Sequence, residues 1–239
     1  MKAFIIYLDT VEVSKRLAEE SLRAAKDHGI DAVLYQGVHG GKDASSKLTQ
    51  YNLELKKHKN RDLTKGEIGC FLSHYELWLK CIALNEPIII LEHDGIFIRP
   101  IPEDILDNFT DVVHLDPLRS VISPINLSSQ YQDFVRKDLT KKIEYFYARP
   151  NGTDVAGEYL YGAYGYCIKP QAANKLINFV KNNGVHPADV VIGKDVVDLK
   201  STTATIVKLH DFYTSGNAFT AVKNSLTSPL SDILEKELK

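Results

Sequence analysis

Hydrophobic and polar positions along this chain fall into blocks that predict strands and helices in alternation. The strand-like blocks are short and rich in β-branched or aromatic residues, and the helix-like blocks repeat apolar residues at i, i+3, i+4 and i+7. The pattern predicts helices over residues 13–28, 66–84 and 171–182, and strands over residues 3–8, 32–36, 88–91, 95–98, 111–115, 143–147 and 204–209. We therefore expect an α/β fold. Because no repeat, heptad run or low-complexity linker divides residues 1–239, we expect a single domain.

The predicted helix over residues 66–84 has two faces of different chemistry. One face is an apolar stripe that suits a hydrophobic core. At about 100° per residue, Glu67, Cys70 and His74 fall together on the opposite face, which predicts a helix covered on both sides. Pro87 ends the block, since the residue before a proline is pushed out of the α region.

The strand predicted over residues 88–91 stops on three polar residues, Glu92, His93 and Asp94. The strand is short, β-branched and bounded by helix breakers, which indicates a buried central position. Ligands of α/β sheets bind in the crevice beyond the carboxyl ends of the strands. The acidic turn is therefore the first candidate for a functional site.

A glycine-rich turn, Gly37 to Gly41, follows the second predicted strand. The opening strand–helix–strand unit resembles a nucleotide-binding half-sheet, but the chain lacks the G-x-G-x-x-G and G-x-x-x-x-G-K-[ST] patterns. We interpret these glycines as turn residues and not as a phosphate cradle.

Composition narrows the function classes that fit such a fold. A hydrophobic content of 44%, a charged content of 25% and a net charge of −2 are typical of a soluble globular enzyme and give no basic footprint for nucleic acid. The sequence holds no apolar run long enough for a signal peptide or a membrane span, which leaves peripheral membrane association open. Cys70, Cys81 and Cys167 show no CxxC spacing, so we interpret them as buried thiols and expect a cytoplasmic protein.

Three stretches of the chain carry a longer motif pattern. The first, Gly66 to Trp78, reads G-E-I-G-C-x-x-S-H-x-x-x-W, the second, Leu91 to Asp94, reads L-E-H-D, and the third, Gly162 to Ile168, reads G-A-Y-G-Y-C-I. Together they resemble glycosyltransferase family 25, the lipooligosaccharide-type and collagen-type galactosyltransferases, whose patterns include L-E-D-D and G-T-x-G-Y-x-I. Weaker similarity at Pro187-Ala188-Asp189 and Ser231-Asp232-Ile233 extends the resemblance over nearly the whole chain.

The resemblance implies a GT-A-type fold, a Rossmann-like mixed sheet flanked by helices. It also implies an inverting, metal-dependent glycosyltransferase that moves a hexose, galactose or glucose, from a UDP-sugar donor. The implied cofactor is Mn2+ or Mg2+, and the implied acceptor is a glycan, a lipid-linked oligosaccharide as in lipopolysaccharide biosynthesis, or a protein. Such a cation neutralises the charge that grows on the departing diphosphate, and it prefers oxygen ligands.

The metal site implied by the resemblance lies in the acidic turn. Asp94 is the first candidate ligand. Glu92, two residues back on the same side of an extended chain, is expected to bind the metal, its waters or the ribose. His210, after the last predicted strand, is the third candidate ligand, and a histidine that only hydrogen-bonds a loop explains it equally well.

On the helix, the resemblance places Glu67, Ser73 and His74 beside the donor. Each residue also has a purely structural explanation. His74 fits a core histidine with satisfied hydrogen bonds, whereas Ser73 and Glu67 fit side chains that bond to the backbone near the helix start.

An inverting transfer needs a base that takes the proton of the acceptor hydroxyl. Asp189 is the leading candidate because it matches the family's P-x-D element, and Asp195, Glu158 and Asp116 are the others. A helix cap near residue 190 explains Asp189 as well.

His93 stands where the family has the middle acid of its motif. By strand alternation its side chain supports the loop from the other face, and alternatively it ligates manganese, since imidazole accepts borderline metals. If the missing acid is a required ligand, the chain is a catalytically impaired glycan-binding or nucleotide-sugar-binding relative. A metal-dependent phosphohydrolase is disfavoured, because the sequence offers no second cluster of His and Asp for a two-metal site.

Overall fold

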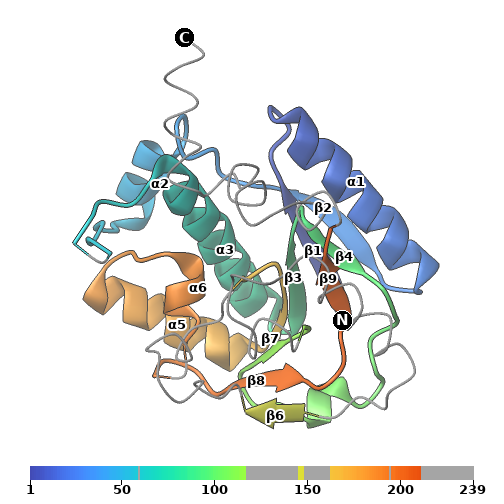
Figure 1. The fold of residues 1–239 in the computed structure, drawn as a ribbon. Coiled ribbons are helices and arrows are strands. Elements are labelled where there is room, and N and C mark those ends of the chain that lie inside the picture. The colour runs from blue at the N-terminus through green and yellow to red at the C-terminus, as the bar shows by residue number, and fades with distance from the viewer. Residues whose placement is uncertain (59, 117–144, 148–161, 194, 211–239) are drawn as a thin grey trace.

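The structure, a computed structural model, is a mixed β-sheet with helices packed on both of its faces (Figure 1). It describes residues 1–58, 60–116, 145–147, 162–193 and 195–210. The helices are α1 (Glu12–Asp27), α2 (Ala44–Tyr51), α3 (Lys65–Leu84), α5 (Pro170–Asn183), α6 (Ala188–Val191) and the 3-10 turn η1 (Ile105–Asp107). The strands are β1 (Lys2–Tyr7), β2 (Ala32–Gln36), β3 (Ile88–Glu92), β4 (Gly95–Phe97), β5 (Val112–His114), β6 (Tyr145–Tyr147), β7 (Gly165–Ile168), β8 (Leu199–Thr202) and β9 (Val207–Leu209).

The main sheet contains seven strands in the order β2-β1-β3-β7-β5-β8-β6. β1 runs parallel to both β2 and β3, so the carboxyl ends of these three strands meet at one edge of the sheet. β7 lies antiparallel between β3 and β5, and β4 and β9 form a separate antiparallel ladder. This arrangement confirms the predicted α/β class with a mixed sheet flanked by helices.

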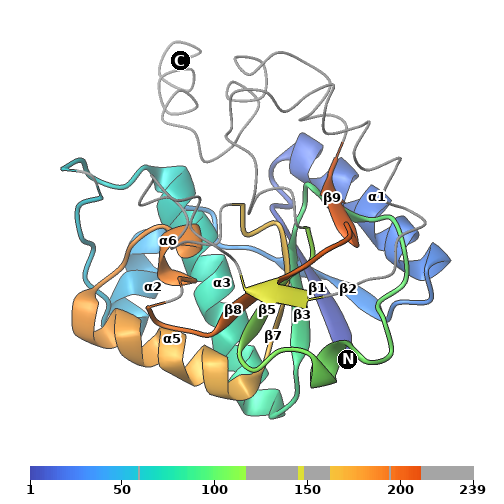
Figure 2. The same ribbon diagram turned by 60° about the horizontal axis from the view of Figure 1, so that its bottom comes forward.

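Alternating side chains of β3 supply two separate hydrophobic layers. Ile88 and Ile90 pack with residues of α3 and α5, whereas Ile89 and Leu91 pack with residues of α1 and the β4–β9 ladder. Figure 2 shows α3 and α5 on one side of the sheet and α1 on the other. Burial on both faces explains the uninterrupted hydrophobic run that predicts this strand.

The amino end of α3 is fixed by a capping box and by close backbone contact. Thr64 Oγ1 accepts a hydrogen bond from the Glu67 N–H, and the Glu67 carboxylate accepts one from the Thr64 N–H. A Cβ atom on Gly69 would lie 2.6 Å from the Val38 carbonyl oxygen, so glycine is needed where the loop after β2 approaches the helix. Ser73 fastens the same contact, because its Oγ accepts from the Val38 N–H and donates to the Gly69 carbonyl.

The predicted glycine turn after β2 is present, but close packing explains its glycines better than turn geometry does. A Cβ atom on Gly40 would collide with the Lys65 carbonyl group. Among the described glycines, positive φ angles occur at Gly29, Gly162 and Gly184, and not in this turn. The loop therefore needs glycine because it lies against the backbone of α3.

The predicted elements agree with the structure where the hydrophobic period is strong. The strand expected over residues 32–36 is β2, whereas the strand expected over 204–209 is shorter because β9 begins at Val207. The pattern misses β8, whose sequence Leu-Lys-Ser-Thr has one large hydrophobic residue and no alternation. Residues 119–142, for which the sequence predicts a loop with some helix, lie outside the described residues.

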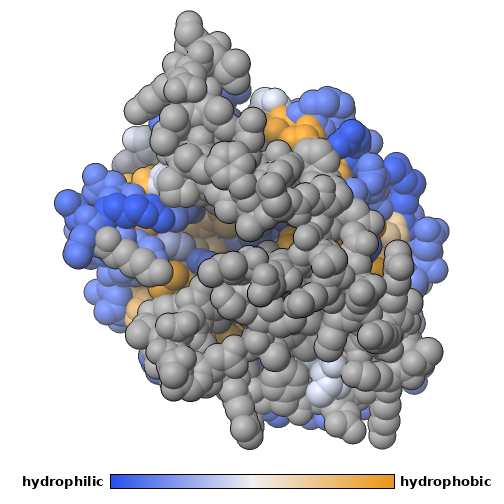
Figure 3. Space-filling view, viewed as in Figure 1, coloured by the Kyte–Doolittle hydropathy of each residue, from blue (hydrophilic) through white to orange (hydrophobic). Residues whose placement is uncertain are grey.

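Few large apolar side chains are exposed on the described surface. In the view of Figure 3 this surface is mostly hydrophilic, with smaller apolar areas between. Among the described residues, the exposed large hydrophobic side chains are Met1, Leu55 and Leu84. None of the described helices combines the length and the apolar character that crossing a membrane requires.

Candidate active site

A pocket opens at the carboxyl ends of β1 and β3, beside α3. Tyr7 and Leu8 line it at the end of β1, Val38 lines it from the loop after β2, and Glu92 and His93 line it at the end of β3. We call this the strand-end pocket. It lies where the sequence predicts a ligand, beyond the carboxyl ends of parallel strands.

A second pocket adjoins Glu92 where α3 meets α6. Its lining includes Glu67, Pro187 and Asp189, and we call it the α6 pocket. Cys70 and Glu92 line both pockets. One carboxylate is therefore placed to meet ligands on two sides.

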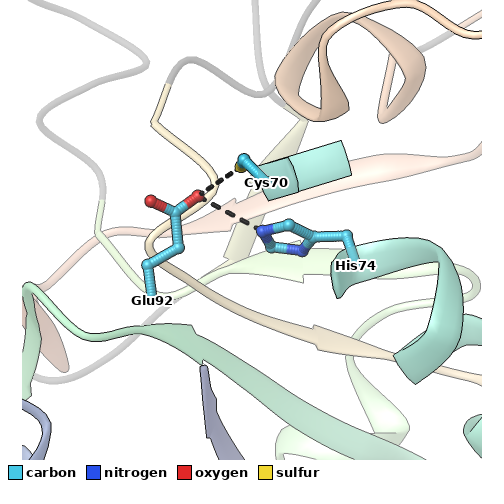
Figure 4. Close-up of side chains that lie close together, drawn as sticks. All are labelled: Cys70, His74 and Glu92. Carbon is cyan, nitrogen blue, oxygen red and sulfur yellow. Dashed lines mark hydrogen bonds and ion pairs between the residues drawn. The ribbon is translucent and has the colours of Figure 1, made fainter. Parts of the chain in front are cut away.

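Glu92 is held by side chains from α3, and these are held in turn by β7. Its Oε1 accepts a hydrogen bond from the Cys70 thiol at 3.5 Å and lies 3.2 Å from His74 Nε2. His74 Nδ1 lies 2.9 Å from the Tyr166 hydroxyl oxygen, which also accepts from Trp78 Nε1 at 2.9 Å. Figure 4 shows Cys70 and His74 converging on one oxygen of Glu92, while its second oxygen points away from both.

The two ends of this chain fix the directions of its hydrogen bonds. The Trp78 N–H can only donate, so the Tyr166 oxygen accepts it. An ionised carboxylate can only accept, so His74 Nε2 donates its proton to Glu92. His74 Nδ1 is then the acceptor for the Tyr166 hydroxyl. The network thus supports Glu92 as an ionised acceptor.

Two carboxylates of the α6 pocket have pKa values displaced in opposite directions. Burial acts to raise the pKa of Glu92, but the hydrogen bonds from His74 and Cys70 hold this pKa below its ordinary value. Burial and the charge of Glu92 raise the pKa of Asp189 to about 6. Near pH 6, Glu92 is ionised and Asp189 is close to its midpoint.

Glu67 lines the α6 pocket, but its carboxylate is already paired. Arg61 donates to both oxygens, at 2.7 and 2.6 Å, and the Thr64 N–H donates to one of them. Burial acts to raise the pKa of Glu67, and the bonds from Arg61 and Thr64 lower it overall. Ser73 and His74 line the strand-end pocket with protein partners of their own. The structural explanations therefore apply to all three residues, and donor binding by them stays a prediction.

The structure brings the backbones of the three predicted metal-binding residues into one region, but Asp94 and His210 do not line the strand-end pocket with Glu92. Asp94 lies in the turn between β3 and β4, directly after Glu92 and His93. The β4–β9 ladder places His210 beside this turn, and the His210 N–H donates to the Asp94 carbonyl at 2.7 Å. The Asp94 side chain is half-buried, and its Oδ1 atom is buried.

His210 is tied to α1 through a carboxylate. Its Nε2 lies 2.7 Å from Glu20 Oε2. Metal-binding histidines commonly donate their second ring N–H to a carboxylate, and a histidine that only fastens the end of β9 makes the same contact. Two carboxylates and an imidazole, from Glu92, Asp94 and His210, fit a divalent cation such as Mn2+ by the chemistry of the donor set.

His93 lines the same pocket as Glu92 instead of turning to the opposite face. The expected alternation does not apply, because β3 ends at Glu92 and His93 belongs to the following turn. Burial lowers the pKa of His93 to about 4, with His210 adding to the shift and Glu92 opposing it. The imidazole is therefore neutral at pH 7.

The candidates for the catalytic base occupy different surroundings. Asp189 lies in the first turn of α6, whose N-cap residue is Pro187, so Asp189 is not the cap that the alternative explanation expects. Asp116 is fully buried, and Asp195 is exposed. Glu158 lies outside the described residues. Of the described candidates, Asp189 is the one that lines a pocket beside Glu92.

Sequence reasoning misses the residues that support Glu92. A signal is present for Cys70, since it lies one helical turn before His74 on the same face. No local pattern links Tyr166 to His74, which is 92 residues away in sequence. Trp78 enters only as a motif residue.

Two adjoining pockets that share Glu92, at the ends of parallel strands, are the arrangement in which α/β proteins typically bind a ligand. The sequence profile of Glycosyltransferase family 25 (LPS biosynthesis protein) matches residues 1–192. The chain belongs to glycosyltransferase family 25.

Individual relatives are distant and longer than the matched region. A Glycosyltransferase 25 family member of Aedes aegypti is 26% identical over 78% of this chain and 30% of its own length. Procollagen galactosyltransferase 2 of Mus musculus is 27% identical over 72% of this chain and 27% of its own length. Lipooligosaccharide biosynthesis protein lex-1 of Haemophilus influenzae is 28% identical over 57% of this chain and 43% of its own length. The matched regions thus span less than half the length of each of these relatives.

Proposed function

We propose that this chain transfers a hexose from a UDP-sugar to a glycan or related acceptor, with inversion and with the help of a divalent cation. The observation that carries the proposal is the position of Glu92, which is held ionised between two adjoining pockets. A transferase requires such an arrangement because donor and acceptor must meet at one centre in a fixed orientation. Membership of family 25 supports the reaction class.

The strand-end pocket is the proposed donor site. Glu92, Asp94 and His210 are the residues that would hold Mn2+ or Mg2+ at its edge. When bound, the cation supplies a positive charge that stabilises the departing diphosphate. The chain's own contribution is to fix the ligands: His74 and Cys70 engage one oxygen of Glu92 and leave the other directed away from them.

The α6 pocket is the proposed acceptor site, with Asp189 as the base. A general base works best when its pKa is near the operating pH, and the pKa of Asp189 is about 6. Its carboxylate would take the proton of the acceptor hydroxyl as the hydroxyl oxygen attacks the sugar. Ionised Glu92 beside it keeps the pKa of Asp189 high.

The names of the relatives support a choice of hexose and of acceptors to test. One relative is named a galactosyltransferase acting on procollagen and another a lipooligosaccharide biosynthesis protein. We therefore propose galactose as the first donor sugar, with glucose as the second. Lipid-linked oligosaccharide and protein hydroxyl groups are the two proposed acceptor classes.

A catalytically impaired relative that binds nucleotide sugar is the second candidate function. It is favoured by His93, a neutral imidazole at the position where the family has an acid. His93→Asp discriminates the two candidates. A large gain in turnover supports impairment of the natural chain, whereas unchanged or lower turnover supports an active enzyme that uses His93.

The proposed activity is tested by UDP release from UDP-galactose and UDP-glucose, with and without Mn2+, in the presence of glycan and peptide acceptors. We expect turnover that depends on the cation and on one donor. Binding of UDP-sugars without turnover for every donor and acceptor tried would overturn the enzyme and leave the binding protein.

Asp94→Ala tests the acidic turn directly. Removing a group that stabilises transition-state charge typically lowers the rate by about 10²–10³-fold, so we expect a loss of this size in cation-dependent turnover with the fold intact. Asp62→Ala, at an exposed position before α3, is the control and should retain activity. Wild-type activity in Asp94→Ala would remove this residue from the mechanism.

A further inference from the structure

Cys70, His74 and Glu92 bring three different ligand atoms to one point. The thiol sulfur, the imidazole nitrogen and a carboxylate oxygen all lie within 4.8 Å of one another. This mixed set differs from the carboxylate-rich turn at Asp94, because it contains a soft sulfur donor. Neither the family resemblance nor the proposed transfer reaction assigns a metal to it.

The backbone positions of the three residues suit a metal site. Cys70 and His74 lie at i and i+4 on α3, the spacing that places two ligands on one face of a helix in zinc-binding H-E-x-x-H sequences. Glu92 supplies the third ligand from the end of β3. A helix and a central strand that pack in one hydrophobic core therefore present the ligands.

Two of the three distances between the ligand atoms agree with tetrahedral zinc, and the third, from Cys70 Sγ to His74 Nε2, is within 4.8 Å. Standard zinc–ligand bond lengths give edges of about 3.4 Å between nitrogen and oxygen and about 3.6 Å between sulfur and oxygen. The corresponding distances here are 3.2 Å from His74 Nε2 to Glu92 Oε1 and 3.5 Å from Cys70 Sγ to the same oxygen. The hydrogen bonds among these side chains hold them near the spacing that a bound ion requires.

The cluster also has an open side. All three residues line the strand-end pocket, and Cys70 and Glu92 line the α6 pocket as well. Zinc sites with three protein ligands keep a fourth position for water or substrate, and the pocket supplies the space for it.

We infer that Cys70, His74 and Glu92 form a binding site for a thiophilic divalent cation, with Zn2+ as the best match. Sulfur and imidazole ligands favour Zn2+ over Mn2+ and Mg2+, which prefer oxygen. The site is therefore separate in its chemistry from the cation site proposed at Asp94, although both use Glu92.

Binding of the cation requires a defined rearrangement of protons. The Cys70 thiol proton leaves to solvent, because the thiolate is the ligand. His74 then carries its one proton on Nδ1 instead of Nε2 and donates it to the Tyr166 oxygen, and the Tyr166 hydroxyl proton rotates away from the imidazole. Burial and the charge of Glu92 raise the pKa of the Cys70 thiol, so a binding cation has to displace the thiol proton. The positive charge of the cation favours this loss of the proton.

Occupation of this site has a consequence that rests on the proposed function. A zinc ion would take Glu92 away from the donor cation and block the junction of the two pockets. Zn2+ should then inhibit cation-dependent glycosyl transfer, and Cys70→Ser should relieve the inhibition. The binding itself requires no transferase activity, so the two ideas fail separately.

The binding test uses Co2+ as a spectroscopic substitute for Zn2+. The full chain, without a histidine tag and after removal of metals by a chelator, is titrated with Co2+ while near-ultraviolet absorption is recorded. We expect a thiolate-to-cobalt charge-transfer band that saturates at one equivalent and disappears on addition of Zn2+. Absence of any such band in the wild-type chain would overturn the site, whatever the variants do.

Cysteine variants locate the site. Cys70→Ser should lose the band, whereas Cys81→Ser and Cys167→Ser should keep it, because these two thiols are buried elsewhere. Tyr166→Phe keeps all three ligands but removes the partner of His74, so Zn2+ affinity should fall by about 10–100-fold. A band that survives in Cys70→Ser would place the cation elsewhere and overturn the proposal.

Discussion

Glu92 and Asp189 line one pocket, but they lie on regions built in different ways. Glu92 ends a central strand and is supported by the hydrogen-bonded chain of His74, Tyr166 and Trp78. Asp189 lies on α6, a helix of four residues at the rim of the same pocket. In the first region, hydrogen-bond donors lower the pKa of the Glu92 carboxylate. In the second region, burial and a neighbouring negative charge raise the pKa of the Asp189 carboxylate.

The difference shows how one cleft provides both a fixed charge and a proton acceptor. A carboxylate with a lowered pKa stays ionised and can bind a cation, whereas one with a pKa near 6 can take up a proton and release it again. Pairs of titratable groups whose surroundings move their pKa values apart mark the division of roles at an active site. In the proposed mechanism, Glu92 therefore supplies the fixed charge and Asp189 transfers the proton.

Asp189→Asn removes the proposed base and leaves Glu92 in place, and it should have the largest effect. Loss of a general base typically lowers turnover by about 10²–10⁴-fold, while UDP affinity should be unchanged because the strand-end pocket is intact. Steady-state kinetics and calorimetric titration with UDP measure the two quantities. Turnover within a few-fold of wild type would show that Asp189 is not the base.

The pH dependence of the wild-type enzyme sharpens the same comparison. Because Asp189 must be ionised to accept a proton, kcat/KM should rise with pH through about 6 and then level off. The residual activity of Asp189→Asn should lack this rise. A limb centred near the ordinary aspartate value in the wild type would contradict the raised pKa.

The cleft was predictable as far as local pattern and motif reach. The run Ile88 to Leu91 predicts a buried strand, and the acidic residues after it indicate the end of the sheet where the pockets lie. The shared face of Glu67, Cys70 and His74 also follows from helical spacing, and all three line one or other pocket. These features depend on residues close together in sequence.

The support of Glu92 was not predictable, because it depends on strand pairing at long range. β7 pairs with β3 through Ile90 and Tyr166, and this register alone brings the Tyr166 hydroxyl to His74. The pKa of Asp189 depends in the same way on how α6 packs against α3. The hydrophobic period predicts which residues are buried, but it does not predict which buried polar groups form hydrogen bonds with one another.

Tyr166→Phe weakens the support of Glu92 without removing a charge, so its effect should be intermediate. The variant leaves the buried Trp78 N–H and His74 Nδ1 without their shared partner, which costs about 1–3 kcal/mol of stability. Turnover should fall about ten-fold with a smaller change in KM, because the position of Glu92 matters most in the transition state.

Tyr35→Phe is the matched control for this variant. It removes a tyrosine hydroxyl that donates to Glu76, outside both pockets. The control should lose some stability and no activity. Equal losses of turnover in the two variants would mean that the network of Tyr166 serves only the fold.

The smallest effect concerns stability, and it distinguishes the two carboxylates without any substrate. The folded-state pKa of Asp189 is about 6, above its ordinary value of 3.8, so the folded protein binds the proton more tightly than the unfolded chain does. Its contribution to stability is therefore complete below about pH 4 and is lost as pH rises through about 6. Asparagine imitates the protonated form, so Asp189→Asn should be more stable than wild type at about pH 8, with a smaller difference at about pH 4.5.

Thermal unfolding at both pH values measures this difference in stability, with Asp195→Asn as the exposed control. A gain that is equal at both pH values would show that packing, and not the ionisation of Asp189, sets the stability of α6.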